Sequence, residues 1–216
     1  MQQGVFHRIS KVLKYFFSSC NPEALYQQGY KYYQKGRYEK AIESFQKLKE
    51  EYPLSELVTM AELGIADAHF STEEYSYAES AYSSFASLHP ANENLPYVMY
   101  QIGMCHYKQI LSIDRDQIET GNALKEFEKL VTRFPASKFS LLAEKKIKEC
   151  KNMLAEHEFY VGELYFKMEQ YKAAMRRFEN IAKNYANLGL DYKVQFFMEE
   201  TRKQLAKTKE PDKAKN

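Results

Sequence analysis

The chain has 216 residues, of which 44% are hydrophobic and 28% are charged, so it has enough apolar side chains to form a core. Its 31 Lys and Arg against 29 Asp and Glu leave a net charge of +2, and this near balance argues against a general nucleic-acid binder, which carries a strong basic excess. With 8 Gly and 6 Pro, the chain is neither collagen-like nor of low complexity.

Residues 1–19 have the character of a signal or targeting segment. Basic residues lead into a short apolar stretch, and Ser18 and Ser19 come directly before Cys20. Small residues before a cysteine resemble the lipobox of bacterial lipoproteins, in which the chain is cut before the Cys and the thiol receives a lipid. We therefore expect lipidation at Cys20. A basic amphipathic leader and a wrongly assigned start codon remain alternatives, because the apolar run is short and Lys14 interrupts it.

Residues 25–53 predict two antiparallel helices joined by a tight turn. Gly29 and Ala41 fit positions where such helices approach so closely that only small side chains are accommodated, and Phe45 fills the space beside them. Pro53 ends the second helix, because proline cannot continue one. The other pattern residues are Tyr32, Gly36 and Leu48. This spacing is that of the tetratricopeptide repeat (TPR).

The same pattern recurs three more times along the chain. The matching residues are Ala66, His69, Ala78, Tyr82, Phe85 and Pro90, then Gly103, His106, Ala123, Phe127, Leu130 and Pro135, then Gly162, Tyr165, Ala174, Phe178 and Ile181. An insertion near residues 112–120 lengthens the third unit. Four units in register predict an all-α fold, a right-handed superhelical TPR solenoid of about four to five helix-turn-helix repeats.

Two further helices are predicted toward the C-terminus. Residues 138–154 have a helical pattern, and we expect this helix to run on into the fourth unit because neither Gly nor Pro separates Ser137 from Val161. Residues 190–205 predict a last helix that caps the array. The chain therefore divides into a targeting segment (1–19), a TPR solenoid domain (20–206) and a basic tail (207–216) that is expected to be disordered.

No pattern in the sequence indicates catalysis, a metal site or a cofactor, so we do not expect an enzyme. A phosphate-binding Gly-rich loop and the metalloprotease and serine-hydrolase signatures are all missing. The three cysteines give neither a disulfide framework nor a zinc pattern, and we expect Cys105 and Cys150 to be buried small residues. His69 and His106 occupy a packing position of the repeat and are expected to be partly buried.

The concave face of a TPR array is formed by the first helix of each repeat, and here that face is mostly aromatic. Such a face favours extended peptides with aromatic or apolar anchors, because each ring offers a large contact area at low entropy cost. The groove residues that we predict are Tyr26, Tyr30, Tyr33, Leu63, Phe70, Tyr97, Tyr100 and Tyr107, with Asp67 on the same face. The alternative for any single residue among them is a core position against a flanking helix.

Several segments resemble the BamD family, the TPR lipoproteins of the outer-membrane β-barrel assembly machinery. The most specific is Tyr-Val-Met-Tyr at residues 97–100, together with the insertion after it. The others are Asn21-Pro22, the first repeat, Ile-Asp-Arg-Asp at residues 113–116, and residues 123–137, 158–165 and 173–180. The resemblance covers roughly residues 20–185. Ala186 departs from it, because the family usually has a proline there, and the final repeat is incomplete.

The resemblance implies a periplasmic protein, held by a lipid on Cys20 at the periplasmic face of the outer membrane. In this family the N-terminal repeats receive unfolded outer-membrane β-barrel proteins, notably an aromatic-ended C-terminal signal. The C-terminal repeats dock on the barrel subunit BamA, and Arg177 and Glu179 match family residues at that contact. The alternative function is a TPR peptide-binding chaperone or adaptor without a BamA role, which is cytosolic, secretion-associated or coordinates the cell envelope.

Overall fold

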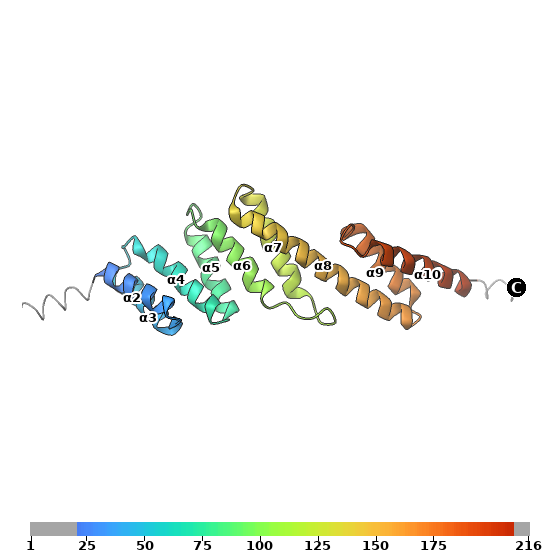
Figure 1. Ribbon diagram of the computed structural model, residues 1–216, viewed down its shortest axis with the longest axis horizontal. Helices are drawn as coiled ribbons and strands as arrows, with labels where there is room; N and C mark the ends of the chain where they lie inside the picture. The colour runs from blue at the N-terminus through green and yellow to red at the C-terminus, as the bar shows by residue number, and fades with distance from the viewer. Residues whose placement is uncertain (1–20, 210–216) are drawn as a thin grey trace, which may run out of the picture. The chain divides into compact units, whose positions relative to one another are not determined.

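The computed structural model describes residues 21–209, which form a series of antiparallel α-helices joined by turns (Figure 1). The chain divides into two compact units, unit 1 (Met1–Cys105) and unit 2 (His106–Asn216). Residues 21–209 contain no strand. The all-α fold of TPR-type helical hairpins that the sequence predicts is thereby confirmed.

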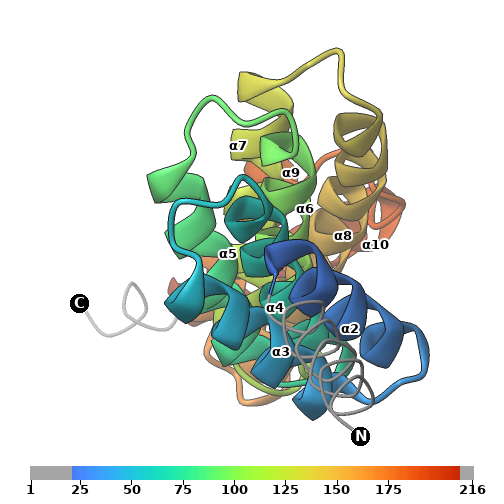
Figure 2. The same cartoon turned by 90° about the vertical axis from the view of Figure 1, so that its left-hand side faces the viewer.

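Unit 1 consists of helical hairpins that pack against one another. Its helices are α2 (Pro22–Gln34), α3 (Tyr38–Glu51), α4 (Leu57–Ser71), α5 (Tyr75–Leu88) and α6 (Leu95–Tyr107), the last belonging to unit 1 up to Cys105. Helix α2 contacts both α3 and α4, and α4 also contacts α5 (Figure 2). The first helix of one repeat therefore packs on the first helix of the next.

The ends of α2 follow from its sequence. The Asn21 side chain accepts a hydrogen bond from the Ala24 amide at 2.6 Å, and Pro22 occupies the first turn, where its missing N–H costs nothing. After the helix, Gly36 adopts a φ of 67°, in the left-handed region that glycine enters without strain. These residues fix both the start of the helix and the turn into α3.

The core of the first repeat forms around Phe45, as the pattern predicts. A Cβ atom at Gly29 would lie 2.6 Å from Phe45 Cε1, and one at Gly64 would lie 2.5 Å from Phe45 Cε2. Helices α2 and α4 thus both contact this ring through a glycine. The core of the second repeat contains Tyr82 and Phe85, which pack in one cluster with Ala66 and Ala78.

Unit 2 contains α7 (Ile118–Arg133), α8 (Lys138–Lys167), α9 (Tyr171–Asn184) and α10 (Asp191–Lys209). The continuous α8 confirms the prediction that this helix runs into the fourth repeat. Its Gly162 contacts the Phe178 ring as Gly29 contacts Phe45, since a Cβ there would lie 2.6 Å from Phe178 Cε1. The repeat residues Phe127, Leu130 and Ile181 are buried as expected.

The predicted C-terminal boundary is wrong by a few residues. Helix α10 continues to Lys209, because the Lys and Thr residues at 207–209 contain no helix breaker before Pro211. The targeting segment 1–19, Cys20 and residues 210–216 lie outside the described residues. Within the described part of the chain, none of the helices has the length and apolar character needed to cross a membrane.

Candidate peptide-binding surface

Apart from Leu63, six of the predicted groove residues lie in unit 1, on the first helices of its repeats. Tyr26, Tyr30 and Tyr33 are on α2, Phe70 is on α4, and Tyr97 and Tyr100 are on α6. All six are at least partly exposed. We call these six residues, together with Asp67 of α4, the aromatic surface.

On α2 the surface presents a stacked pair of tyrosines. The Tyr26 and Tyr30 rings are 6.4 Å apart with an interplanar angle of 9°, and the Tyr26 ring is 5.7 Å from that of the buried Phe45. Tyr30 is 46% exposed. The inner ring is therefore held by the core, while the outer ring is offered to solvent.

Tyr33 links α2 to α4. Its hydroxyl lies 3.1 Å from Ser71 Oγ, and the Ser71 hydroxyl donates to the Asp67 carbonyl at 2.8 Å. Further along α4, the Phe70 ring packs edge-on against Tyr75 at 5.4 Å. These contacts hold the Tyr33 and Phe70 side chains in place near the C-terminal end of α4.

Asp67 connects three helices at the centre of this surface. The hydroxyls of Tyr82 (α5) and Tyr97 (α6) both donate to Asp67 Oδ1, at 2.5 and 2.6 Å. Gln101 in turn donates to the Tyr97 hydroxyl at 3.1 Å. Burial raises the pKa of Asp67 above its ordinary value of 3.8, although the tyrosine hydrogen bonds act in the opposite direction. Burial and the nearby carboxylate also raise the pKa of Tyr82 and Tyr97.

Two of the predicted groove residues are placed differently. Leu63 is only 6% exposed because it packs in the core of the second repeat with Val98 and Ile102, so its assignment to the groove is wrong. Tyr107 belongs to unit 2, where its hydroxyl donates to Glu149 and its ring lies 4.1 Å from Lys146 Nζ.

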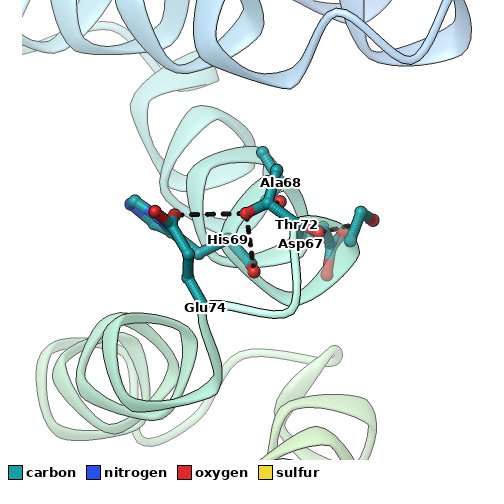
Figure 3. A network of polar contacts seen from close by, with 6 residues as sticks. Asp67, Ala68, His69, Thr72 and Glu74 are labelled. Carbon is teal, nitrogen blue, oxygen red and sulfur yellow. Dashed lines mark hydrogen bonds and ion pairs between the residues drawn. The ribbon is translucent and has the colours of Figure 1, made fainter.

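The histidines at the packing position are partly buried, as predicted, and each contacts a glutamate near the start of the following helix. At the end of α4, His69 Nδ1 lies 2.7 Å from Glu74 Oε2, and the Thr72 hydroxyl donates to the same oxygen at 3.1 Å (Figure 3). These hydrogen bonds lower the pKa of Glu74. In unit 2, His106 makes the equivalent contact to Glu119 at 2.7 Å. Each histidine therefore links the end of one helix to the start of the next.

Cys105 and Cys150 are buried small residues, as predicted. Burial raises the pKa of the Cys105 thiol to about 12 and that of Cys150 to about 11, so neither thiol is activated as a nucleophile. Residues 21–209 contain no cluster of three or more His, Cys, Asp or Glu side chains that would hold a metal ion.

Arg177 of α9 forms an ion pair with α8. Its Nη1 donates to both oxygens of Glu158, at 2.9 and 3.1 Å, and the two side chains are 40% and 16% exposed. Arg177 and Glu158 also line a hollow of unit 2 with Tyr165 and Asn180. Glu179 is exposed on the same helix.

Sequence reasoning missed the link between Tyr82 and Asp67. Tyr82 stands where the other repeats have Phe45, Phe127 and Phe178, so it adds a hydroxyl to a buried ring position. A buried hydroxyl needs a hydrogen-bond partner, and Asp67 provides it. The exchange of Phe for Tyr in one repeat was the signal that could have revealed the contact.

A profile of the YfiO family, described as outer membrane lipoprotein, matches residues 19–216. The chain belongs to this family. It is 33% identical over 161 residues to outer membrane protein assembly factor BamD of Rickettsia prowazekii, which covers 74% of this chain and 64% of that protein. It is 30% identical over 159 residues to BamD of Caulobacter vibrioides, covering 74% and 52%. The match thus spans between half and two thirds of these two YfiO relatives.

Solved TPR structures resemble the chain at low sequence identity. The TPR2AB domain of yeast Sti1, in a structure described as a complex with pHSP90, has a TM-score of 0.49 at 17% identity and covers 85% of this chain and 70% of that one. A TPR protein from Parabacteroides merdae has a TM-score of 0.45 at 14% identity, covering 86% and 74%.

Proposed function

We propose that this YfiO-family chain is a periplasmic lipoprotein component of outer-membrane β-barrel assembly. In this role the aromatic surface of unit 1 captures extended segments of unfolded barrel proteins, and unit 2 docks on a BamA-type subunit. The proposal is supported by the family membership and by the assembly-factor names of the relatives. Membrane attachment is through a lipid on Cys20.

The stacked Tyr26–Tyr30 pair is the observation that carries the binding role. Tyr26 rests on the buried Phe45 ring, so the pair is held in place before a ligand arrives. A ring that is already ordered loses little entropy when it binds, and its exposed face offers both apolar contact and a polar edge. An unfolded chain with aromatic side chains matches this chemistry.

Docking through α9 is supported by the geometry of Arg177. A guanidinium has five N–H donors, and the contact to Glu158 uses only Nη1. In this proposal the remaining donors of Arg177 bind an acidic group of the partner, and the exposed Glu179 of the same helix adds a second contact.

The binding role is tested with the double variant Tyr30→Ala/Tyr33→Ala and a fluorescent peptide that ends in an aromatic residue and has an amidated C-terminus. We expect binding to weaken by about 1–3 kcal/mol in total, because two aromatic contacts are removed. The matched control is Tyr77→Ala, which removes a 68% exposed tyrosine from α5, outside the aromatic surface. Unchanged affinity in a double variant that keeps its helical circular dichroism would refute the assignment.

A further inference from the structure

The aromatic surface contains a carboxylate at its centre but has no positive charge to balance it. The two tyrosine hydroxyls both donate to Asp67 Oδ1, which leaves Oδ2 to accept a further hydrogen bond. Asp67 is partly exposed. Its negative charge contributes to raising the pKa of Tyr26 and Tyr33 of α2 and of Tyr97 of α6. The carboxylate thus lies among rings from both flanking helices.

The charges on these helices are distributed unevenly. Within α2, α4 and the unit 1 part of α6 the only Lys or Arg is Lys31. At about 100° per residue, Lys31 is turned by about 100° from Tyr30 and about 140° from Tyr26, away from the aromatic surface. By the same spacing Glu23 lies about 20° from Tyr30, on the same side. His69 is paired with Glu74. The surface is therefore aromatic and negative.

This combination has a definite chemical preference. A peptide that covers the surface removes water from Asp67, which is unfavourable unless the peptide supplies a donor or a positive charge. The faces of the surrounding tyrosine rings attract the same kind of group, because a cation over an aromatic face is stabilised by the ring quadrupole. A peptide carboxylate, by contrast, would meet a like charge at close range.

We propose that Asp67 is the specificity determinant of the aromatic surface and selects extended segments that carry a Lys or Arg side chain next to their aromatic residues. The Lys or Arg head group reaches Asp67 Oδ2 while the neighbouring aromatic side chains of the segment pack on Tyr26, Tyr30 and Tyr97. This inference rests on the proposed peptide-binding function and names the class of segment that it takes.

The test uses the full chain and three peptides with blocked ends. The peptides share an extended sequence with two aromatic residues around one variable position, which is Lys, Gln or Glu. We expect the wild-type chain to bind them in that order, with about a tenfold difference between the Lys and Glu peptides. Raising the NaCl concentration should reduce this ratio, because salt screens the ion pair.

The decisive variant is Asp67→Asn, which keeps an oxygen acceptor for Tyr82 and Tyr97 but removes the charge. The ratio between the Lys and Glu peptides should then fall below about twofold. The control is Glu43→Gln on α3, which changes the net charge equally at an exposed position outside the surface. It should leave the ratio unchanged.

Several results would overturn the inference. Equal binding of the Lys and Glu peptides by the wild-type chain would do so, as would a ratio that survives Asp67→Asn or disappears equally in Glu43→Gln. If Asp67→Asn does not fold, the peptide order and its salt dependence in the wild-type chain decide. If none of the three peptides binds, peptide capture itself is wrong, and this inference is wrong with it.

Discussion

Single glycines set how closely the helices of each repeat approach. Gly29 and Gly162 stand at the same repeat position, and each meets the ring of a phenylalanine from the following helix. Gly121 of α7 differs from them, because a Cβ there would have no atom within 4 Å. The three glycines therefore separate the effect of a close contact from the effect of helix propensity.

We expect Gly29→Ala and Gly162→Ala to lower the free energy of unfolding by about 1–3 kcal/mol each, because the added methyl overpacks the Phe45 or Phe178 ring. Gly121→Ala should raise it by about 0.5–1 kcal/mol, since alanine favours the helix and meets nothing. Urea denaturation of the three variants gives the comparison. A loss of stability in Gly121→Ala, or none in the other two, would contradict this account.

Asp67 should make stability depend on pH in a specific direction. Its pKa is raised in the folded state, so the folded chain binds more protons than the unfolded chain above the ordinary value of 3.8. Its contribution to stability therefore falls as pH rises through the interval from 3.8 to the folded pKa. Asparagine does not titrate. The stability of Asp67→Asn relative to wild type should thus increase between about pH 3 and about pH 7.

Denaturation of both proteins across this range measures the difference directly. A difference that stays flat, or that falls toward neutral pH, would show that burial does not disfavour the charge. The expected result also fits a binding role, because functional sites often contain residues that lower stability.

At the scale of the helices, the pair Arg177–Glu158 joins α9 to α8 and also lies where docking is proposed. We expect Arg177→Glu to lower the free energy of unfolding by about 1 kcal/mol or less, since the pair is partly exposed and two like charges would then face each other. The reversed pair Arg177→Glu/Glu158→Arg should restore the stability.

Binding of the purified BamA-type subunit then separates the two roles of Arg177. If Arg177 itself contacts the partner, the reversed pair stays defective in docking although its stability is normal. Recovery of docking with the reversed pair would mean that Arg177 acts only by joining α8 and α9. Tyr30→Ala serves as the control here, because it lies in unit 1 and should leave docking unchanged.

The helices were largely predictable, because they follow from residues that recur at fixed spacing. Gly29, Phe45 and Pro53 mark one repeat. The absence of Gly and Pro between Ser137 and Val161 predicted that α8 is one long helix. The individual contacts of the site were less predictable. Leu63 shares the periodicity of exposed residues, yet its side chain is covered by Val98 and Ile102 from α6, which a pattern within one helix does not register.

At the scale of the whole molecule, the proposed attachment to the membrane depends on Cys20, which lies outside the described residues. We expect the protein from native membranes to have an intact mass that shows cleavage before Cys20 and added acyl chains. A Cys20→Ser variant should no longer be found in the outer-membrane fraction. An uncleaved chain that begins at Met1 would contradict the lipoprotein assignment. If Cys20→Ser changes fraction although the wild-type mass shows no acyl chains, Cys20 contributes to another kind of attachment.

We expect the continuous helix α8 to make unit 2 more cooperative than a simple array of hairpins. Arrays of separate repeats can open one repeat at a time from either end. Helix α8, about 45 Å long, pairs with α7 through Lys151–Glu128 and with α9 through Gly162 and Arg177–Glu158. Opening either hairpin of unit 2 removes the packing from one part of a helix whose other part belongs to the second hairpin. We therefore expect unit 2 to open and close as one element, so that a partner bound to α9 also stabilises α7.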